Sequence, residues 1–316
     1  MRDISAGIER PRWCLGGRTN IVLNCLDKWA GTATQDKPAL QWCGENGESL
    51  TWSYGELNDR VCALAAGLRR LGLGKGDVIA IYLPNLPEAA VPLLAIPKIG
   101  ATVLPLFSGF GADAVASRLT DAGAKAVITT DGSYRRGRVV AAKQVIDEVR
   151  SMVPSLEHTI VCHRADVAMQ WQEGADHHWA DVVSETEGDD RSTASMEADS
   201  PFLLVYTSGT TGKPKGVIHT HCGFPVKTML DIGICLDFKP DDRILWMSDM
   251  GWMVGPLLVY GATLMGGTMV LAEGTPDYPT YDRMWRLVED NRVTYLGIAP
   301  TMARSFMANP SFDPDQ

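Results

Sequence analysis

Short apolar segments alternate with amphipathic segments through most of this 316-residue chain, and this alternation constrains its fold more than any other feature. Residues 77–83, 101–106 and 126–130 are predicted to be buried strands, and segments with helical periodicity at 88–99 and 113–122 separate them. Parallel strands need long crossover connections of this kind, and such connections are right-handed. The pattern therefore predicts an α/β fold of mostly parallel sheets with helices on both faces.

A further helix is predicted to precede the first of these strands. Ser53-Tyr-Gly-Glu56 is a capping box, in which the serine hydroxyl and the glutamate carboxylate bind free amides of the first turn. Apolar residues then recur on one helical face as far as Leu71, and Gly72 supplies a left-handed stop. In the helix at 88–99, Pro92 and Pro97 predict a break, because proline removes a backbone donor and crowds the preceding turn.

The alternation lapses over residues 185–200, where six acidic residues stand against one basic residue. We expect a solvated linker at 191–200, dividing an N-terminal α/β subdomain (1–190) from a second one (201–316) that stacks on it. In the second subdomain, strands are predicted at 202–206, 244–247, 268–271 and 293–298, and helices at 281–291 and 302–308.

Charge and cysteine content exclude several classes of protein. The net charge of −9 argues against a nucleic-acid partner, because binding to phosphates requires an excess of basic residues. Seven cysteines without a C-x-x-C pair predict reduced thiols and a cytoplasmic protein. Residues 251–272 carry no charge, but five glycines and Pro256 interrupt them, so we expect a buried helix, turn and strand there, and no membrane span.

The segment Tyr206–Val217 carries the most informative chemistry. It follows an apolar strand and reads Y-T-S-G-T-T-G-K-P-K-G-V. Glycines let backbone amides approach an anion, hydroxyls donate hydrogen bonds to its oxygens, and Lys213 and Lys215 add charges suited to phosphate. It is not a Walker A loop, because Thr207 replaces the first glycine and Pro214 follows the lysine. A flexible linker is the alternative, but linkers rarely start from a buried strand.

This segment resembles, position by position, the phosphate-loop signature of the adenylate-forming superfamily, the AMP-forming acyl-CoA synthetases. Four shorter elements are similar to the acetyl-CoA synthetase branch: Trp13-x-x-Gly-Gly17, Arg135-Arg-Gly-Arg138, Asp249-Met-Gly-Trp252 and Ala299-Pro-Thr301. The resemblance runs from about residue 13 to the end and covers the N-terminal portion of such an enzyme. It implies a ligase that uses ATP and Mg²⁺ to activate a small carboxylic acid as an acyl-adenylate, and then transfers the acyl group to coenzyme A.

The resemblance also implies roles for individual residues. It assigns binding of ATP and pyrophosphate to Thr207, Ser208, Gly209, Thr210, Thr211, Gly212, Lys213 and Lys215. Trp252, Met253 and Val254 are expected in the wall of the acyl pocket, where Met-Val replaces the Val-Thr common in acetyl enzymes. Arg135 and Arg138 are expected to meet a phosphate of coenzyme A, which suits their forked guanidinium groups. The resemblance assigns no catalytic residue and no metal ligand within the chain, and it places Asp277 where the family often has Asn.

Other interpretations of these residues stay open. Trp252 could be ordinary core, and the arginine-rich segment could be a solvated turn. His219 and His221 are spaced like metal ligands, but no Cys or carboxylate stands at ligand spacing beside them, which favours a structural role.

The resemblance places nucleoside recognition and a catalytic lysine beyond Gln316, so we expect the chain by itself to be inactive or nearly so. Two alternatives to a coenzyme A ligase remain. One is an adenylation domain that loads a carrier protein, and the other is a non-catalytic remnant with residual phosphate binding.

Overall fold

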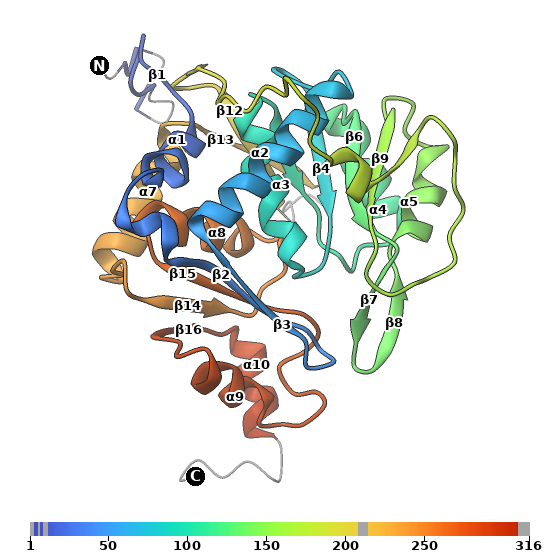
Figure 1. Ribbon diagram of the computed structural model, residues 1–316, viewed down its shortest axis with the longest axis vertical. Coiled ribbons are helices and arrows are strands. Elements are labelled where there is room, and N and C mark those ends of the chain that lie inside the picture. The colour runs from blue at the N-terminus through green and yellow to red at the C-terminus, as the bar shows by residue number, and fades with distance from the viewer. Residues whose placement is uncertain (1–2, 6, 9–11, 208–213, 309–316) are drawn as a thin grey trace.

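The computed structural model describes residues 3–5, 7–8, 12–207 and 214–308. Within these residues, a seven-stranded sheet and a five-stranded sheet form the centre, with helices packed on and between them (Figure 1). Most neighbouring strands of both sheets are parallel, so the predicted α/β class is confirmed.

The two sheets have simple strand orders. The seven-stranded sheet consists, in spatial order, of β10 (Asp176–His178), β9 (His158–Cys162), β6 (Ala126–Thr130), β4 (Val78–Tyr82), β5 (Thr102–Pro105), β12 (Pro201–Thr207) and β13 (Lys215–Thr220). The five-stranded sheet consists of β16 (Tyr295–Gly297), β14 (Arg243–Trp246), β15 (Thr268–Ala272), β2 (Pro38–Cys43) and β3 (Ser49–Ser53). Only the pairs β12–β13 and β2–β3 are antiparallel in these sheets.

Helices cover the sheets and fill the space between them. The principal helices are α2 (Tyr54–Arg70), α3 (Pro87–Lys98), α4 (Ala112–Ala122), α5 (Lys143–Arg150), α8 (Val254–Met265), α9 (Arg283–Asp290) and α10 (Pro300–Met307). The largest apolar core joins α2, α3 and α8 to strands of both sheets. Separate cores lie under α4 and α5 on the seven-stranded sheet, and under α9 and α10 on the five-stranded sheet.

Smaller elements complete the fold. They are α1 (Ile21–Cys25), α6 (Trp179–Val182), α7 (Gly223–Thr228), the 3-10 turns Asp27–Trp29 and Ala33–Asp36, a π-helical segment Met229–Cys235, the pair β1 (Arg18–Thr19) and β11 (Met196–Glu197), and the hairpin β7 (Gly132–Arg135) with β8 (Arg138–Ala141). The strands and helices predicted from the sequence are present, with ends that differ by a few residues.

Local sequence signals explain the start and end of α2. The Ser53 hydroxyl accepts a hydrogen bond from the Glu56 amide at 3.1 Å, and the Glu56 carboxylate accepts one from the Ser53 amide at 2.8 Å. The helix ends just before Gly72, whose φ is +79°. The predicted capping box and left-handed stop are therefore confirmed.

The predicted break in α3 is wrong. The helix runs unbroken from Pro87 to Lys98 with Pro92 and Pro97 inside it. Every residue of α3 except Glu88 is buried, so packing against both sheets outweighs the hydrogen bonds that the prolines remove.

Each large sheet contains strands from both sides of the expected linker at 191–200. β12 and β13 follow it in sequence but complete the sheet of the first half, whereas β2 and β3 complete the sheet of the second half. The start of the linker is bound to α2. The Arg69 guanidinium donates hydrogen bonds to the carbonyls of Asp190 and Ser192 at 2.6 and 2.8 Å. The division into 1–190 and 201–316 therefore does not match the composition of the sheets.

The charge-free segment forms the predicted helix, turn and strand. α8 ends at Gly266, whose φ of +78° turns the chain into the fully buried strand β15. Across the described residues, every helix falls short of the length and apolar character that a membrane crossing requires.

Candidate functional site

The glycine- and hydroxyl-rich segment joins two antiparallel strands at one edge of the seven-stranded sheet. Thr207 at the end of β12 stands opposite Lys215 at the start of β13. Both residues are exposed, and the Thr207 hydroxyl donates to the Lys215 carbonyl at 3.5 Å. The remaining predicted phosphate ligands, Ser208, Gly209, Thr210, Thr211, Gly212 and Lys213, lie outside the described residues. The predicted binding segment is therefore the connection of a β-hairpin.

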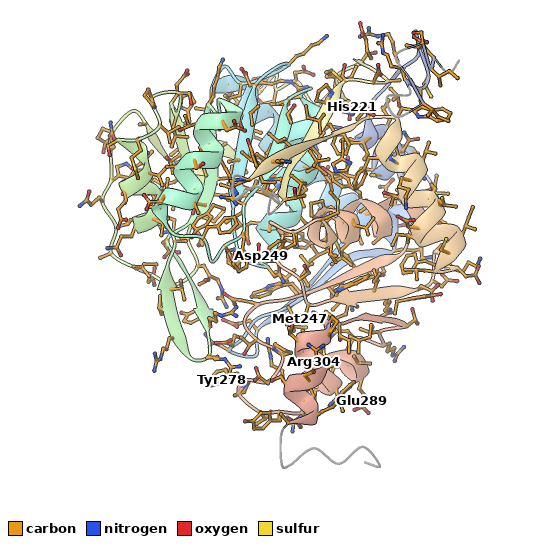
Figure 2. All side chains as sticks on the ribbon, turned by 180° about the vertical axis from the view of Figure 1, so that it is seen from behind. His221, Met247, Asp249, Tyr278, Glu289 and Arg304 are labelled. Carbon is orange, nitrogen blue, oxygen red and sulfur yellow. The ribbon has the colours of Figure 1, made fainter. Side chains whose placement is uncertain are left out.

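Asp249 joins two loops near the centre of the molecule (Figure 2). Its carboxylate accepts a hydrogen bond from the Ser108 hydroxyl at 2.5 Å and another from the Gly251 amide at 2.8 Å. Burial raises the pKa of Asp249 above its usual value, and these hydrogen bonds and the charge of Arg135 oppose the rise. Asp249 thus fixes the segment that carries the predicted acyl-pocket residues.

The predicted acyl-pocket residues occupy different environments. The Trp252 side chain is 47% exposed and lies beside Phe107, with ring centroids 5.7 Å apart. Met253 is half-buried against the largest core, and Val254 begins α8. The exposure of Trp252 does not fit the alternative that it is ordinary core.

Gly251 allows the close approach behind this tryptophan. A β-carbon on Gly251 would lie 2.0 Å from the Phe107 nitrogen and 2.3 Å from the Leu106 carbonyl carbon. Since both are backbone atoms, no side-chain rotation could make room. The absence of a side chain at Gly251 therefore sets the contact between the Trp252 loop and the loop after β5.

The predicted pair of arginines lies at the end of the β7–β8 hairpin. Arg135 and Arg138 face each other across the strands, and Arg136 and Gly137 form the turn with φ values of +52° and +68°. Two left-handed residues are typical of the tightest hairpin turns. Arg135 and Arg138 are exposed, and neither guanidinium has a hydrogen bond or ion pair to any described residue. Arg136 instead pairs with Asp277, whose oxygens lie 2.7 and 2.9 Å from its Nη2.

Sequence reasoning missed the buried residues that hold this hairpin. Glu273 follows β15, and its fully buried carboxylate accepts hydrogen bonds from the Tyr134 amide at 3.1 Å and from Arg164 Nη2 at 2.7 Å. The Arg164 guanidinium also lies 4.8 Å from the Tyr134 ring centroid. No local pattern marks these residues, because their partners come from distant parts of the chain.

The two histidines that resembled metal ligands lie in apolar surroundings. His221 is fully buried, and its Nδ1 accepts a hydrogen bond from the Ile21 amide at 3.1 Å. Burial lowers the pKa of His221 to about 4 and also lowers the pKa of His219. The nitrogen of His221 that accepts from Ile21 is already engaged, which supports the structural interpretation.

Acid should therefore destabilise the chain through His221. Between about pH 6.5 and pH 4 the unfolded chain binds a proton at this residue and the folded chain does not, so stability falls as the pH falls through this window. With these two pKa values, the loss between pH 7 and pH 5 is about 2 kcal/mol. Urea unfolding at both pH values should show this loss in the wild type.

The matched variant for this test is His221→Asn, which keeps an acceptor for the Ile21 amide and cannot ionise. Its stability should fall by about 2 kcal/mol less than that of the wild type over the same interval. Equal pH dependence of the two proteins would contradict a buried neutral His221.

Comparisons with known proteins agree with this arrangement. A family model described as AMP-binding enzyme matches residues 26–316. Acetyl-coenzyme A synthetase from Deinococcus radiodurans is 42% identical over 298 residues, covering 94% of this chain and 46% of that protein. Acetyl-coenzyme A synthetase from Escherichia coli K12 is 40% identical over 301 residues, with the same coverage of 94% and 46%.

A solved structure of acetoacetyl-CoA synthetase from Streptomyces lividans has a TM-score of 0.86 and 30% identity, covering 94% of this chain and 45% of that one. The chain thus spans a little less than half the length of these relatives. Because the family model matches nearly all of its residues, the chain belongs to the AMP-binding enzyme family.

Proposed function

We propose that the chain is the N-terminal portion of an AMP-forming acid–CoA ligase that acts on a small carboxylic acid. The observation that supports this most strongly is the hairpin connection after β12, where hydroxyls, glycines and two lysines follow a buried strand in a chain of the AMP-binding family. The relatives named acetyl- and acetoacetyl-CoA synthetases favour a short acyl group.

The proposed reaction has two steps. A carboxylate oxygen attacks the α-phosphorus of ATP while the bond to pyrophosphate breaks, which gives the acyl-adenylate. The thiol sulfur of coenzyme A then attacks the acyl carbonyl, loses its proton and displaces AMP. Thr210, Thr211 and Lys213 would bind the β- and γ-phosphates while negative charge develops on the departing pyrophosphate.

Mg²⁺ is proposed to accompany the nucleotide and to neutralise phosphate charge. Hydroxyl and phosphate oxygens are ligands that this ion prefers, so the serine and threonines of the connection fit it. The part of the chain that the structure describes has no group of three or more His, Cys, Asp or Glu side chains able to hold a metal. We infer that the phosphate oxygens of the nucleotide supply most of the ligands of Mg²⁺.

The other substrates are assigned to the loop that follows Asp249 and to the end of the β7–β8 hairpin. Trp252, with Met253 and Val254, would form a wall of the acyl pocket, and Arg135 and Arg138 would bind a phosphate of coenzyme A. The free guanidinium groups favour coenzyme A over a carrier protein, because a terminal phosphate monoester suits an arginine pair. A cytoplasmic location is proposed from the sequence, in which the seven cysteines form no C-x-x-C pair.

Calorimetry on the chain with ATP or pyrophosphate, in the presence of Mg²⁺, tests the phosphate role. Combined replacement of Thr210, Thr211 and Lys213 by alanine should weaken binding about tenfold or more, because charge-assisted hydrogen bonds to phosphate are lost. Lys227→Ala, at an exposed lysine of α7 paired with Asp231, is the matched control and should bind as the wild type does. Unchanged affinity in the triple variant would sink the proposal.

A further inference from the structure

The turn between β7 and β8 is bound by a buried carboxylate from the five-stranded sheet. Glu45 lies in the connection between β2 and β3 and is 4% exposed. Its Oε2 accepts the Arg136 amide at 2.9 Å, and its Oε1 accepts the Gly137 amide at 2.8 Å. One carboxylate therefore engages both amides of the two-residue turn.

The loop after β15, residues 273–278, contacts both this carboxylate and the turn. A β-carbon on Gly274 would lie 2.0 Å from Glu45 Oε2, so only glycine leaves room for the carboxylate there. A β-carbon on Gly137 would lie 2.2 Å from the Tyr278 hydroxyl oxygen, which places Tyr278 directly against the turn. Figure 2 shows Tyr278 beside the end of this hairpin.

The loop after β15 supplies an acidic partner to the middle one of the three arginines of the hairpin. Asp277 pairs with Arg136 through both of its oxygens, whereas Arg135 and Arg138 have no such partner among the described residues. Glu273 binds the amide of Tyr134 and so fastens β7 one residue before Arg135. The acids therefore engage the backbone and the middle arginine, and they leave the outer pair free for a ligand.

We propose that Glu45 is a positioning residue, which holds the Arg136–Gly137 turn so that Arg135 and Arg138 present their guanidinium groups together to the nucleotide phosphate of coenzyme A. This inference rests on the proposed function. Because the end of the hairpin is already ordered before binding, less of the binding free energy is lost in ordering it. Glu45 acts through the backbone and does not itself contact the ligand.

Titration of the chain with coenzyme A and with dephospho-coenzyme A, which lacks the 3′-phosphate, tests the inference. Glu45→Gln keeps the side-chain size but leaves one turn amide facing an NH₂ group, which cannot accept its hydrogen bond. We expect coenzyme A to bind about tenfold more weakly and dephospho-coenzyme A to bind as before. Glu45→Asp, which keeps the charge but cannot reach both amides, should shift the ratio of the two affinities in the same direction.

Glu48→Gln is the matched control. Glu48 belongs to the same β2–β3 connection, but its side chain is 42% exposed and pairs with Arg164 instead of the turn. This variant should keep the wild-type ratio of affinities. Circular dichroism melting identifies any variant that fails to fold. If Glu45→Gln fails to fold, the affinities of Glu45→Asp decide whether Glu45 positions the turn.

The outcomes separate this inference from the proposed function. Wild-type chain that binds both ligands equally, together with an unaffected Arg135→Ala/Arg138→Ala variant, would overturn the coenzyme A role of the hairpin and this inference with it. An arginine variant that selectively loses coenzyme A, beside Glu45 variants with an unchanged ratio, would overturn the positioning role alone. Equal weakening of both ligands by the Glu45 variants would also overturn it.

Discussion

Replacement of Gly251 by alanine is expected to destabilise the chain by about 3 kcal/mol. The new methyl group would lie 2.0 Å from the Phe107 nitrogen, so the loop that holds Trp252 and Asp249 must separate from the loop after β5. The hydrogen bonds of Asp249 to Ser108 cross the same contact and should be lost with it. Urea unfolding measures the loss of stability.

Gly111→Ala is the control for this variant. Gly111 precedes α4 with a φ of −80°, and a β-carbon there would have no atom within 4 Å. Alanine at this position should change stability by no more than about 1 kcal/mol, because the lower entropy of the unfolded chain and the weaker N-cap act in opposite directions. If both variants were equally stable, the close approach at Gly251 would not exist in solution.

The second large effect is expected at Asp176, where Asp176→Ala should cost about 3 to 5 kcal/mol. Lys143 is fully buried, and its Nζ donates to Asp176 at 3.0 Å. Arg150 pairs with the other carboxylate oxygen, and the Gln172 amide donates to the carboxylate at 2.8 Å. Removing the acid leaves the buried Lys143 ammonium with Asp147 as its one remaining carboxylate, and it leaves Arg150 without its acid. Losing both buried pairs is far more costly than losing an exposed ion pair.

Asp231→Ala provides the comparison on the surface. Asp231 and Lys227 also form an ion pair, but their side chains are 37% and 66% exposed. The expected change is about 0.5 kcal/mol or less. Denaturant unfolding of the two variants side by side measures both effects, and a small loss in Asp176→Ala would contradict the buried network.

The sequence predicted the elements whose signals are local. Apolar strands such as β6 and β15, and the capped helix α2, follow directly from residue order. The hairpin β7–β8 was missed, because Val139 and Val140 are exposed and the arginine-rich turn lacks the alternation of a half-buried strand. Sheet membership was equally hidden, since β15 pairs with β2 across more than half of the chain.

In the candidate site, too, the sequence revealed residues with a local signal and missed those with distant partners. The family resemblance singled out Arg135 and Arg138, because the residues of that element are adjacent in sequence. It could not find Glu45 and Glu273, which bind the hairpin backbone from 91 and 139 residues away. Such contacts arise only when two sheets meet, and carboxylates that bind backbone amides leave no periodic pattern in the sequence.

The exchange of strands between the sheets has a consequence for cooperativity. A cut at residues 191–200 would leave the first fragment with β2 and β3 but without β15, and the second with β12 and β13 but without β5. Neither fragment could bury its strands alone, so the two halves must melt together and regain structure only by association with each other.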